Sequence, residues 1–168
     1  MKKIVLTYGL ISGAIGAALL LAHVPFMGSL DYNTSLIVGY TGIVLSGLLI
    51  FFGVRSYREN AGGGKISFGR GFSVGILIAL ISAACYVATW EVVYFSNPGI
   101  ADHVFDKPIQ DMKAAGAPQE KIDAAEREME SFKKLYSNPV ANAAFTFIEP
   151  FPVGLILTVI SAFVLRRK

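Results

Sequence analysis

The chain has 168 residues, of which 54% are hydrophobic and 16% are charged, and its formal net charge is +3 at pH 7. The length fits one domain, but so few charges among so many apolar residues exclude an ordinary soluble domain and indicate a lipid bilayer as the surroundings. The sequence shows no basic and aromatic pattern of a nucleic-acid-binding module, so no nucleic-acid partner is predicted.

Four apolar segments are long enough to cross about 30 Å of hydrocarbon at about 1.5 Å of helix per residue. They cover residues 4–23, 36–54, 72–95 and 143–165, and none contains Lys or Arg. Lipid offers no partner for backbone N–H and C=O groups, and strands of a membrane barrel would alternate apolar with polar residues. We therefore predict an all-α fold, a bundle of four transmembrane helices that makes residues 1–168 a single integral membrane domain.

The basic residues near the ends of these segments are unequally distributed. Nine of them lie before the first segment, between the second and third segments, or after the fourth. They are Lys2, Lys3, Arg55, Arg58, Lys65, Arg70, Arg166, Arg167 and Lys168. The short loop 24–35 has no Lys or Arg. Because Lys and Arg beside membrane helices are retained in the cytoplasm, we predict a multi-pass protein of the bacterial inner (cytoplasmic) membrane with cytoplasmic N- and C-termini. Apart from Lys2 and Lys3, these residues are expected to contact anionic lipid headgroups.

The long loop between the third and fourth segments contains two helical patterns, residues 101–115 and 119–136. Gly116 suits the end of the first helix and Pro118 the first turn of the second. Apolar residues at helical spacing predict that the two helices pack on each other or lie on the membrane, as an extracytoplasmic helical hairpin over residues 101–136. The other faces carry mixed charge, which is typical of a solvated surface; a docking surface for an extracytoplasmic protein partner is the alternative.

Two carboxylates lie inside the apolar segments. Glu91 is about four residues, roughly 6 Å, from the outer end of the third segment, and Glu149 is about six residues, roughly 9 Å, from that of the fourth. His23, at the outer end of the first segment, belongs to the same layer. Polar groups in membrane helices usually face the bundle interior or a wet cavity, so these three residues are the candidate membrane-embedded polar site.

Three interpretations of this layer stay open. Each acid is satisfied locally by a Trp, Tyr, Ser or Thr side chain or by interfacial water. Alternatively, Glu91 and Glu149, with His23, form a proton-linked site for a small ligand or ion. A metal site is the third interpretation, but no closely spaced His and Glu pair supports it, and no metal is predicted.

Two prolines follow Glu149 and bear on the shape of the fourth segment. Pro150 and Pro152 lack an N–H and would each leave a carbonyl four residues earlier without its helical donor. We predict a kink or break beside Glu149. In the alternative, the helix begins only at Phe151; residues 153–165 alone would span about 20 Å, which is short for a membrane helix.

No catalytic motif is visible. The two histidines, His23 and His103, lie in no nucleophile and base arrangement, and the single Cys85 permits no intramolecular disulfide. We therefore predict no enzyme and no cofactor. The first expectation is a non-enzymatic accessory or interaction protein of the cell envelope. The alternative is a small ion- or proton-coupled transporter or ligand binder that uses Glu91 and Glu149. The sequence leaves the oligomeric state open.

Short motifs are spread over nearly the whole chain. They include Tyr57-Arg58, Lys65-Ile66-Ser67-Phe68-Gly69, Asn138-Pro139, Thr146-Phe147, Glu149, Phe151-Pro152-Val153-Gly154-Leu155 and the ending Leu165-Arg166-Arg167-Lys168. In these motifs the chain resembles the small bacterial membrane proteins of the domain of unknown function 4199 family. The resemblance implies a four-helix integral membrane protein with an outer helical insertion, and it implies no activity, cofactor or catalytic residue.

Overall fold

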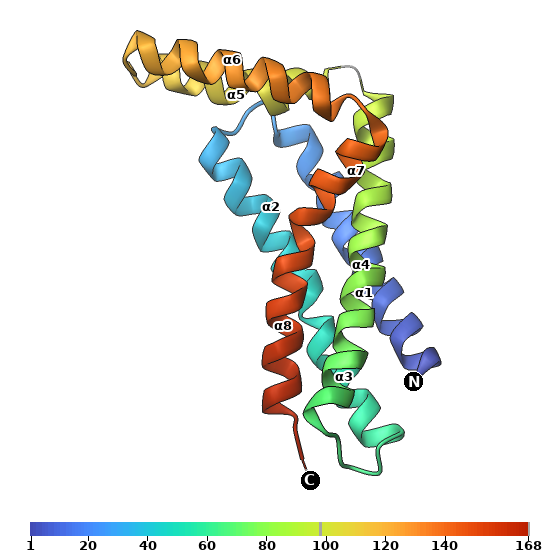
Figure 1. Ribbon diagram of the computed structural model, residues 1–168. Helices are drawn as coiled ribbons and strands as arrows, with labels where there is room; N and C mark the ends of the chain where they lie inside the picture. Colours follow the sequence, from blue (N-terminus) through green and yellow to red (C-terminus); the bar gives the residue numbers. More distant parts are fainter. Residues whose placement is uncertain (98, 168) are drawn as a thin grey trace.

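The computed structural model describes residues 1–97 and 99–167, and in this part of the chain the regular structure is helical. Four stretches, called spans below, are long and apolar enough to cross a membrane, judged by length and composition: Lys2–Phe26, Tyr32–Asn60, Phe68–Ser96 and Pro139–Val164. They form a bundle, and a further pair of helices lies across one end of it (Figure 1). The predicted all-α class with four membrane-length spans is confirmed for the described residues.

The helices follow one another in a simple order. The first span is α1 (Lys2–His23) with the short 3-10 helix η1 (Val24–Phe26), the second is α2 (Tyr32–Gly47) with α3 (Leu49–Asn60), and the third is α4 (Phe68–Ser96). The pair across the end is α5 (Ile100–Ala114) and α6 (Gln119–Tyr136), and the fourth span is α7 (Pro139–Ile148) with α8 (Pro150–Val164).

Polar side chains begin the second and third spans earlier than hydropathy predicts. The Asp31 carboxylate accepts a hydrogen bond from the Thr34 N–H at 3.1 Å, and the Ser67 hydroxyl accepts one from the Arg70 N–H at 3.3 Å. Such N-caps satisfy backbone donors that a helix start leaves unpaired. The helices therefore start at residues 32 and 68 instead of the predicted 36 and 72, because the capping residues lie outside the apolar runs.

Glycines let α1 and α4 approach each other closely. A Cβ atom added at Gly9 would lie 2.8 Å from the Ile81 Cβ, and one added at Gly13 would lie 2.6 Å from the Cys85 Cβ. Small residues at helix contacts in membranes allow such packing of backbones. These two glycines thus serve a contact within the chain.

One end of the bundle, called the basic end, holds the α3–α4 loop and the C-terminal residues, and the first residues of α1 lie toward it (Figure 1). Its interior is filled by a cluster of buried side chains: Val5, Ile50, Val54, Ile66, Val74, Ile78, Ala79 and Leu165. The opposite end, called the covered end, has its own cluster, which joins α5 and α6 to α1 and α4: Leu20, Trp90, Tyr94, Ile100, Phe105 and Tyr136. The amphipathic pair is therefore packed on the bundle.

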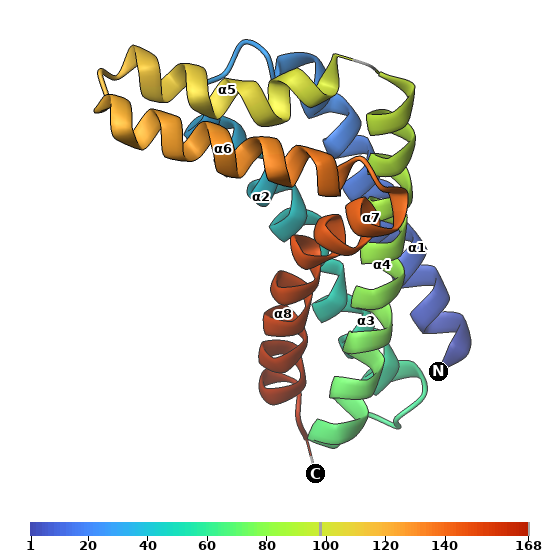
Figure 2. The ribbon, with the colours of Figure 1, turned by 45° about the horizontal axis from the view of Figure 1, so that its top comes forward.

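Helices α5 and α6 also pack along each other, as Figure 2 shows. The Phe105 and Phe132 ring centroids are 6.0 Å apart, and Lys113 Nζ lies 2.7 Å from Glu126 Oε1. Gly116, with φ +70°, ends α5 in the left-handed conformation that glycine adopts readily. The side of the membrane on which the pair lies stays a prediction.

We expect Gly13→Ala to lower the free energy of unfolding by about 1–3 kcal/mol, because the added methyl must displace α4 or Cys85. The matched control is Gly69→Ala, where an added Cβ meets no atom within 4 Å. There alanine should leave stability unchanged or slightly raised, because it favours helix over glycine. Denaturant unfolding in detergent, followed by circular dichroism, measures both. Equal stability of the two variants would contradict the close α1–α4 contact.

Candidate functional site

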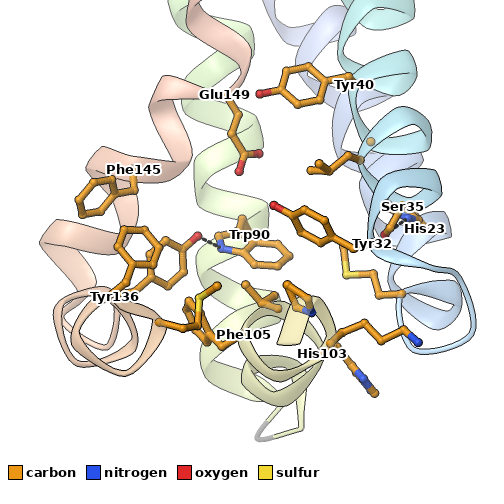
Figure 3. A pocket seen from close by; sticks show the side chains of 18 of the residues that line it. His23, Tyr32, Ser35, Tyr40, Trp90, His103, Phe105, Tyr136, Phe145 and Glu149 are labelled. Carbon is orange, nitrogen blue, oxygen red and sulfur yellow. Dashed lines mark hydrogen bonds between the residues drawn. The ribbon is translucent and has the colours of Figure 1, made fainter. Parts of the chain in front are cut away.

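A cavity of about 670 Å³ lies at the covered end, bounded by α1, α2, α4 and α7 and roofed by α5 and α6 (Figure 3). Its aromatic lining consists of Tyr32, Tyr40, Tyr86, Trp90, Phe105, Phe132, Tyr136 and Phe145. Its polar and charged lining includes His23, Ser35, His103, Lys107, Glu128 and Glu149. A mostly apolar hollow of this size with a few polar groups is typical of a small-molecule site.

Glu149 stands at the break in the fourth span. Helix α7 ends at Ile148 and α8 begins at Pro150, so Glu149 is both the last cap of one helix and the first cap of the next. Its N–H reaches the Thr146 carbonyl at 3.3 Å, which is the oxygen that Pro150 has no N–H to bind. The span is thus interrupted where the prolines Pro150 and Pro152 were expected to interrupt it.

The Glu149 carboxylate points into the cavity, beside Tyr40 and above Trp90 in the view of Figure 3. Tyr86 donates a hydrogen bond from its hydroxyl to Glu149 Oε2 at 3.3 Å. Among the described residues, Glu149 has no Lys, Arg or His within ion-pair distance. Within the described ranges, the Glu149 carboxylate therefore has one neutral hydrogen-bond donor, Tyr86, and no charged partner.

His23 lines the same cavity from the end of α1. It is buried, and its Nε2 lies 3.0 Å from the Ser35 hydroxyl at the start of α2. The structure therefore brings two of the three residues of the predicted polar layer, His23 and Glu149, to one space.

Glu91 lies elsewhere. Its neighbour Trp90 lines the cavity and Glu91 does not, because successive residues of an α-helix point about 100° apart around its axis. Its Oε1 atom is buried and makes no hydrogen bond with a described residue. Glu91 therefore does not share the cavity that His23 and Glu149 line.

A chain of buried hydrogen bonds fixes the wall of the cavity between α4, α6 and α7. Trp90 donates from Nε1 to the Tyr136 hydroxyl at 2.9 Å, and this hydroxyl lies 3.0 Å from that of Thr146. Thr146 donates to Asn142 Oδ1 at 3.2 Å, and Asn142 donates from Nδ2 to the Tyr136 carbonyl at 3.2 Å. Because Thr146 uses its proton toward Asn142, Tyr136 is the donor to Thr146. Burial raises the pKa of Tyr136 to about 12, so its hydroxyl keeps the proton that this bond requires.

Sequence reasoning missed this network as a unit. Asn142 and Thr146 stand four residues apart, which places both on one face of α7. That spacing inside an apolar segment is a usable signal of a polar contact. Their partner Tyr136 lies on another helix, and only the folded chain brings it to them.

A second attachment holds the roof at the opposite side of the cavity. Asp111 of α5 accepts a hydrogen bond from the Tyr32 N–H at 2.8 Å, and its other oxygen lies 3.2 Å from Lys107 Nζ. The bond from Tyr32, followed by the contact with Lys107, lowers the pKa of Asp111 below its ordinary value. Both groups are exposed, so this attachment is weaker than the buried chain at Trp90.

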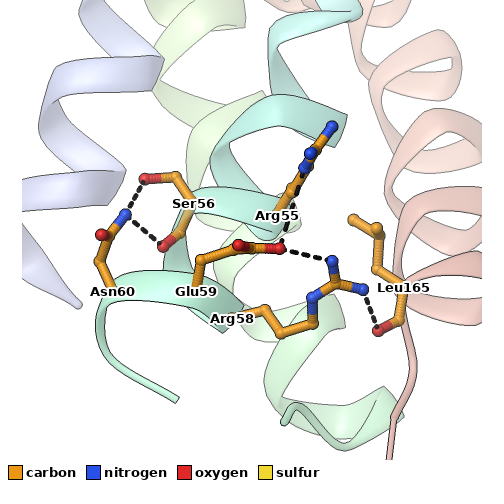
Figure 4. A network of polar contacts seen from close by, with 6 residues as sticks. All are labelled: Arg55, Ser56, Arg58, Glu59, Asn60 and Leu165. Carbon is orange, nitrogen blue, oxygen red and sulfur yellow. Dashed lines mark hydrogen bonds and ion pairs between the residues drawn. The ribbon is translucent and has the colours of Figure 1, made fainter. Parts of the chain in front are cut away.

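The basic end contains the residues predicted to contact headgroups. Arg58 donates to Glu59 Oε1 at 2.7 Å and to the Leu165 carbonyl at 3.4 Å (Figure 4). Ile66 and Arg167 are joined by two backbone hydrogen bonds of 3.0 Å each. The other expected residues that the structure describes are exposed: Arg55, Lys65, Arg70, Arg166 and Arg167. Lys168 lies outside the described residues. The contacts with headgroups stay a prediction, and the sequence did not predict the link between the C-terminus and the loop.

Residues 7–167 match a family described as Protein of unknown function (DUF4199). The chain belongs to this family. The match spans both the cavity and the basic end, and it confirms the resemblance found in the sequence. No match was found among the curated proteins or among the solved structures.

The chemistry that this DUF4199 cavity offers is limited. Its walls are mostly aromatic and apolar, and its polar and charged groups include hydroxyls, two imidazoles, carboxylates and the Lys107 ammonium. Among the described residues, no group of three His, Cys, Asp or Glu side chains is arranged to hold a metal ion. The arrangement can surround an apolar molecule and bind a donor or positive charge at Glu149.

We expect Tyr136→Phe to lower the free energy of unfolding of this DUF4199 protein by about 1–3 kcal/mol, because it leaves the buried Trp90 N–H without an acceptor. The matched control is Tyr8→Phe, since Tyr8 packs against the basic-end cluster and its hydroxyl makes no hydrogen bond recorded for the described residues. Trp90 is the single tryptophan, so denaturant unfolding followed by its fluorescence measures both variants. If both substitutions lowered stability equally, the chain of hydrogen bonds would not be what holds this wall.

Proposed function

We propose that this DUF4199 chain is a non-enzymatic, multi-pass protein of the bacterial inner membrane that binds a small molecule with an apolar body in the cavity beneath α5 and α6. The observation that carries the proposal is the cavity of about 670 Å³ with Glu149 pointing into it. The cavity is partly open, and its mostly apolar and aromatic lining with a few polar groups is the kind of surface that small-molecule sites present. A bound molecule would contact this lining, which favours a binding site.

Binding is favoured over transport by what lies beyond the cavity. Toward the basic end, the next hollow that borders on Tyr86 has a volume of only about 20 Å³, enough for about one water, and Ser46 and Ser82 line it. Below it, the basic-end cluster fills the bundle with apolar side chains, of which Val54, Val74 and Ile78 have 0% of their surface exposed. Among the described residues, the hollows and the packed side chains thus leave a molecule in the cavity no open path to the basic end in this conformation. The ligand-binding form of the alternative hypothesis is thus the one that we adopt.

A protein partner on α5 and α6 is the second candidate function. Part of the charged surface of this pair is used within it, since Lys133 lies 3.5 Å from Asp102 and 3.7 Å from Asp106. Other charged side chains, such as Glu120, Lys121 and Arg127, are exposed. Exposed mixed charge is ordinary for a solvated helix, so it supports an accessory role less strongly than the cavity supports ligand binding.

The distribution of basic residues supports a topology in which the basic end is cytoplasmic and the covered end is outside. We expect a membrane-impermeant maleimide to label the Ala124→Cys variant in intact cells, and to label Ala61→Cys only after the membrane is opened. Both positions are exposed, the first in α6 and the second in the α3–α4 loop. Cys85→Ala, which keeps the Cβ atom, serves as the background. The opposite labelling pattern would reverse the topology.

A variant that fills the cavity tests the binding function. Gly39 lines the cavity, and a Cβ added there meets only His23 ring atoms at 3.9 Å, so Gly39→Phe should place its ring in the open space. The probe is 8-bromooctan-1-ol, whose bromine quenches tryptophan fluorescence at contact. We expect saturable quenching of Trp90 in the unmodified protein, reconstituted in nanodiscs, and at least about ten-fold weaker binding in Gly39→Phe, which is about 1.4 kcal/mol.

Gly69→Phe is the control for this experiment, because an added Cβ there meets no atom within 4 Å and the residue lies at the start of α4, far along the chain from Trp90. It should bind the probe as the unmodified protein does. Quenching that never saturates, or that is the same in Gly39→Phe and in the unmodified protein, would rule out the cavity as a binding site.

A further inference from the structure

The charge of the cavity is unbalanced at its deep end. Glu149 receives one hydrogen bond, from the neutral Tyr86, and no basic side chain of the described residues forms an ion pair with it. The lysine that lines the cavity, Lys107, lies 3.2 Å from Asp111 at the roof. A carboxylate at membrane depth is costly unless it is paired or reaches water. A positive charge carried by the ligand would pair with it.

The side chains around Glu149 suit a cation as well. Figure 3 shows its carboxylate in the space between Tyr40 and Trp90, whose aromatic rings also line the cavity. The faces of Trp and Tyr rings attract ammonium groups, and proteins that bind organic ammonium ions often surround them with such rings. A carboxylate-bearing ligand, in contrast, would be repelled by Glu149.

The size of the cavity decides against a bare ion. A cavity of about 670 Å³ lies in the range of sites for drug-sized molecules, and an inorganic cation at Glu149 would leave most of it empty. Away from Glu149, the lining includes the apolar side chains Leu20, Met27 and Phe105, and its charged and imidazole groups on α5 and α6 are His103, Lys107 and Glu128. The ligand must therefore have a long apolar part as well as its charge.

We infer that the cavity takes an amphiphilic organic cation, with its ammonium group at Glu149 and its apolar chain along Leu20, Met27 and Phe105 toward the roof. This inference rests on the proposed function, because it names the ligand class of the same site.

The test compares three probes of equal chain length: 8-bromooctylamine, 8-bromooctan-1-ol and 8-bromooctanoate. Quenching of Trp90 is measured at pH 7 in nanodiscs of zwitterionic lipid, and the part of the quenching that does not saturate is subtracted as the contribution of partition into lipid. We expect the amine to bind at least about ten-fold more tightly than the alcohol, because hydrogen bonds to charged groups are stronger than those between neutral groups. The octanoate should bind most weakly.

Two variants test whether the tighter binding of the amine depends on the Glu149 carboxylate. Glu149→Gln should remove the advantage of the amine and leave the affinity for the alcohol within about two-fold, since the amide keeps the shape but not the charge. Glu91→Gln is the matched control, because Glu91 also lies within a span but does not line the cavity, and it should keep the full preference. Tyr40→Leu, at a position that is 46% exposed, should lose part of the preference through the missing ring.

The outcomes separate the two proposals. If no probe quenches Trp90 saturably, the proposed function fails and the inference fails with it. If the alcohol binds but the amine binds no more tightly, or the octanoate binds best, the cation inference is overturned while the binding function stands. The comparison in the unmodified protein decides this even if Glu149→Gln does not fold.

Discussion

The hydrogen bond that Trp90 donates to Tyr136 is the contact on which the covered end depends. It joins the third span, near its covered end, to the last residue of α6, and through Thr146 it continues into α7. All three side chains are at most 7% exposed, so each polar group must find its partner inside the protein. The bond thereby fixes where the roof of the cavity meets its wall, and aromatic rings on both sides of it exclude water.

Glu149, at the break in the fourth span, is one of the polar groups that line the cavity. A continuous fourth span would have a regular helix at this position, with its carbonyls bonded four residues ahead. Because Pro150 and Pro152 have no N–H, α7 ends and α8 starts anew, and the carboxylate between them enters the cavity. The close α4–α8 contact below the break, where a Cβ added at Gly154 would lie 2.9 Å from the Ala79 Cβ, leaves no comparable space on that side. Glu149 therefore lies where the cavity of the covered end meets the closely packed part of the bundle.

Much of this architecture was predictable because it follows from local chemistry. Long apolar runs predict spans, Gly116 predicts the end of α5, and two prolines predict an interruption beside Glu149. The residues that act across the fold were harder to find. Asp31 and Ser67 lengthen two spans from outside the apolar runs, and Tyr136 lies in a polar helix until it meets Trp90. Glu91 and Glu149 were predicted at similar depths below the outer ends of their segments. Depth does not determine the direction in which a side chain leaves its helix, and Glu149 points into the cavity whereas Glu91 does not line it.

The roof is held unequally at its two sides. On the α4 side, the contact is buried and aromatic, with Tyr136 also 5.3 Å from the Tyr94 ring centroid and 5.5 Å from that of Phe105. On the α2 side, the Tyr32–Asp111 bond is exposed to water, which competes for both groups. Opening the α2 side breaks one exposed bond, whereas opening the α4 side exposes an aromatic cluster and several buried donors. The two sides of the roof are therefore held by contacts of different strength, and the buried aromatic cluster at Trp90 is the more stable of the two.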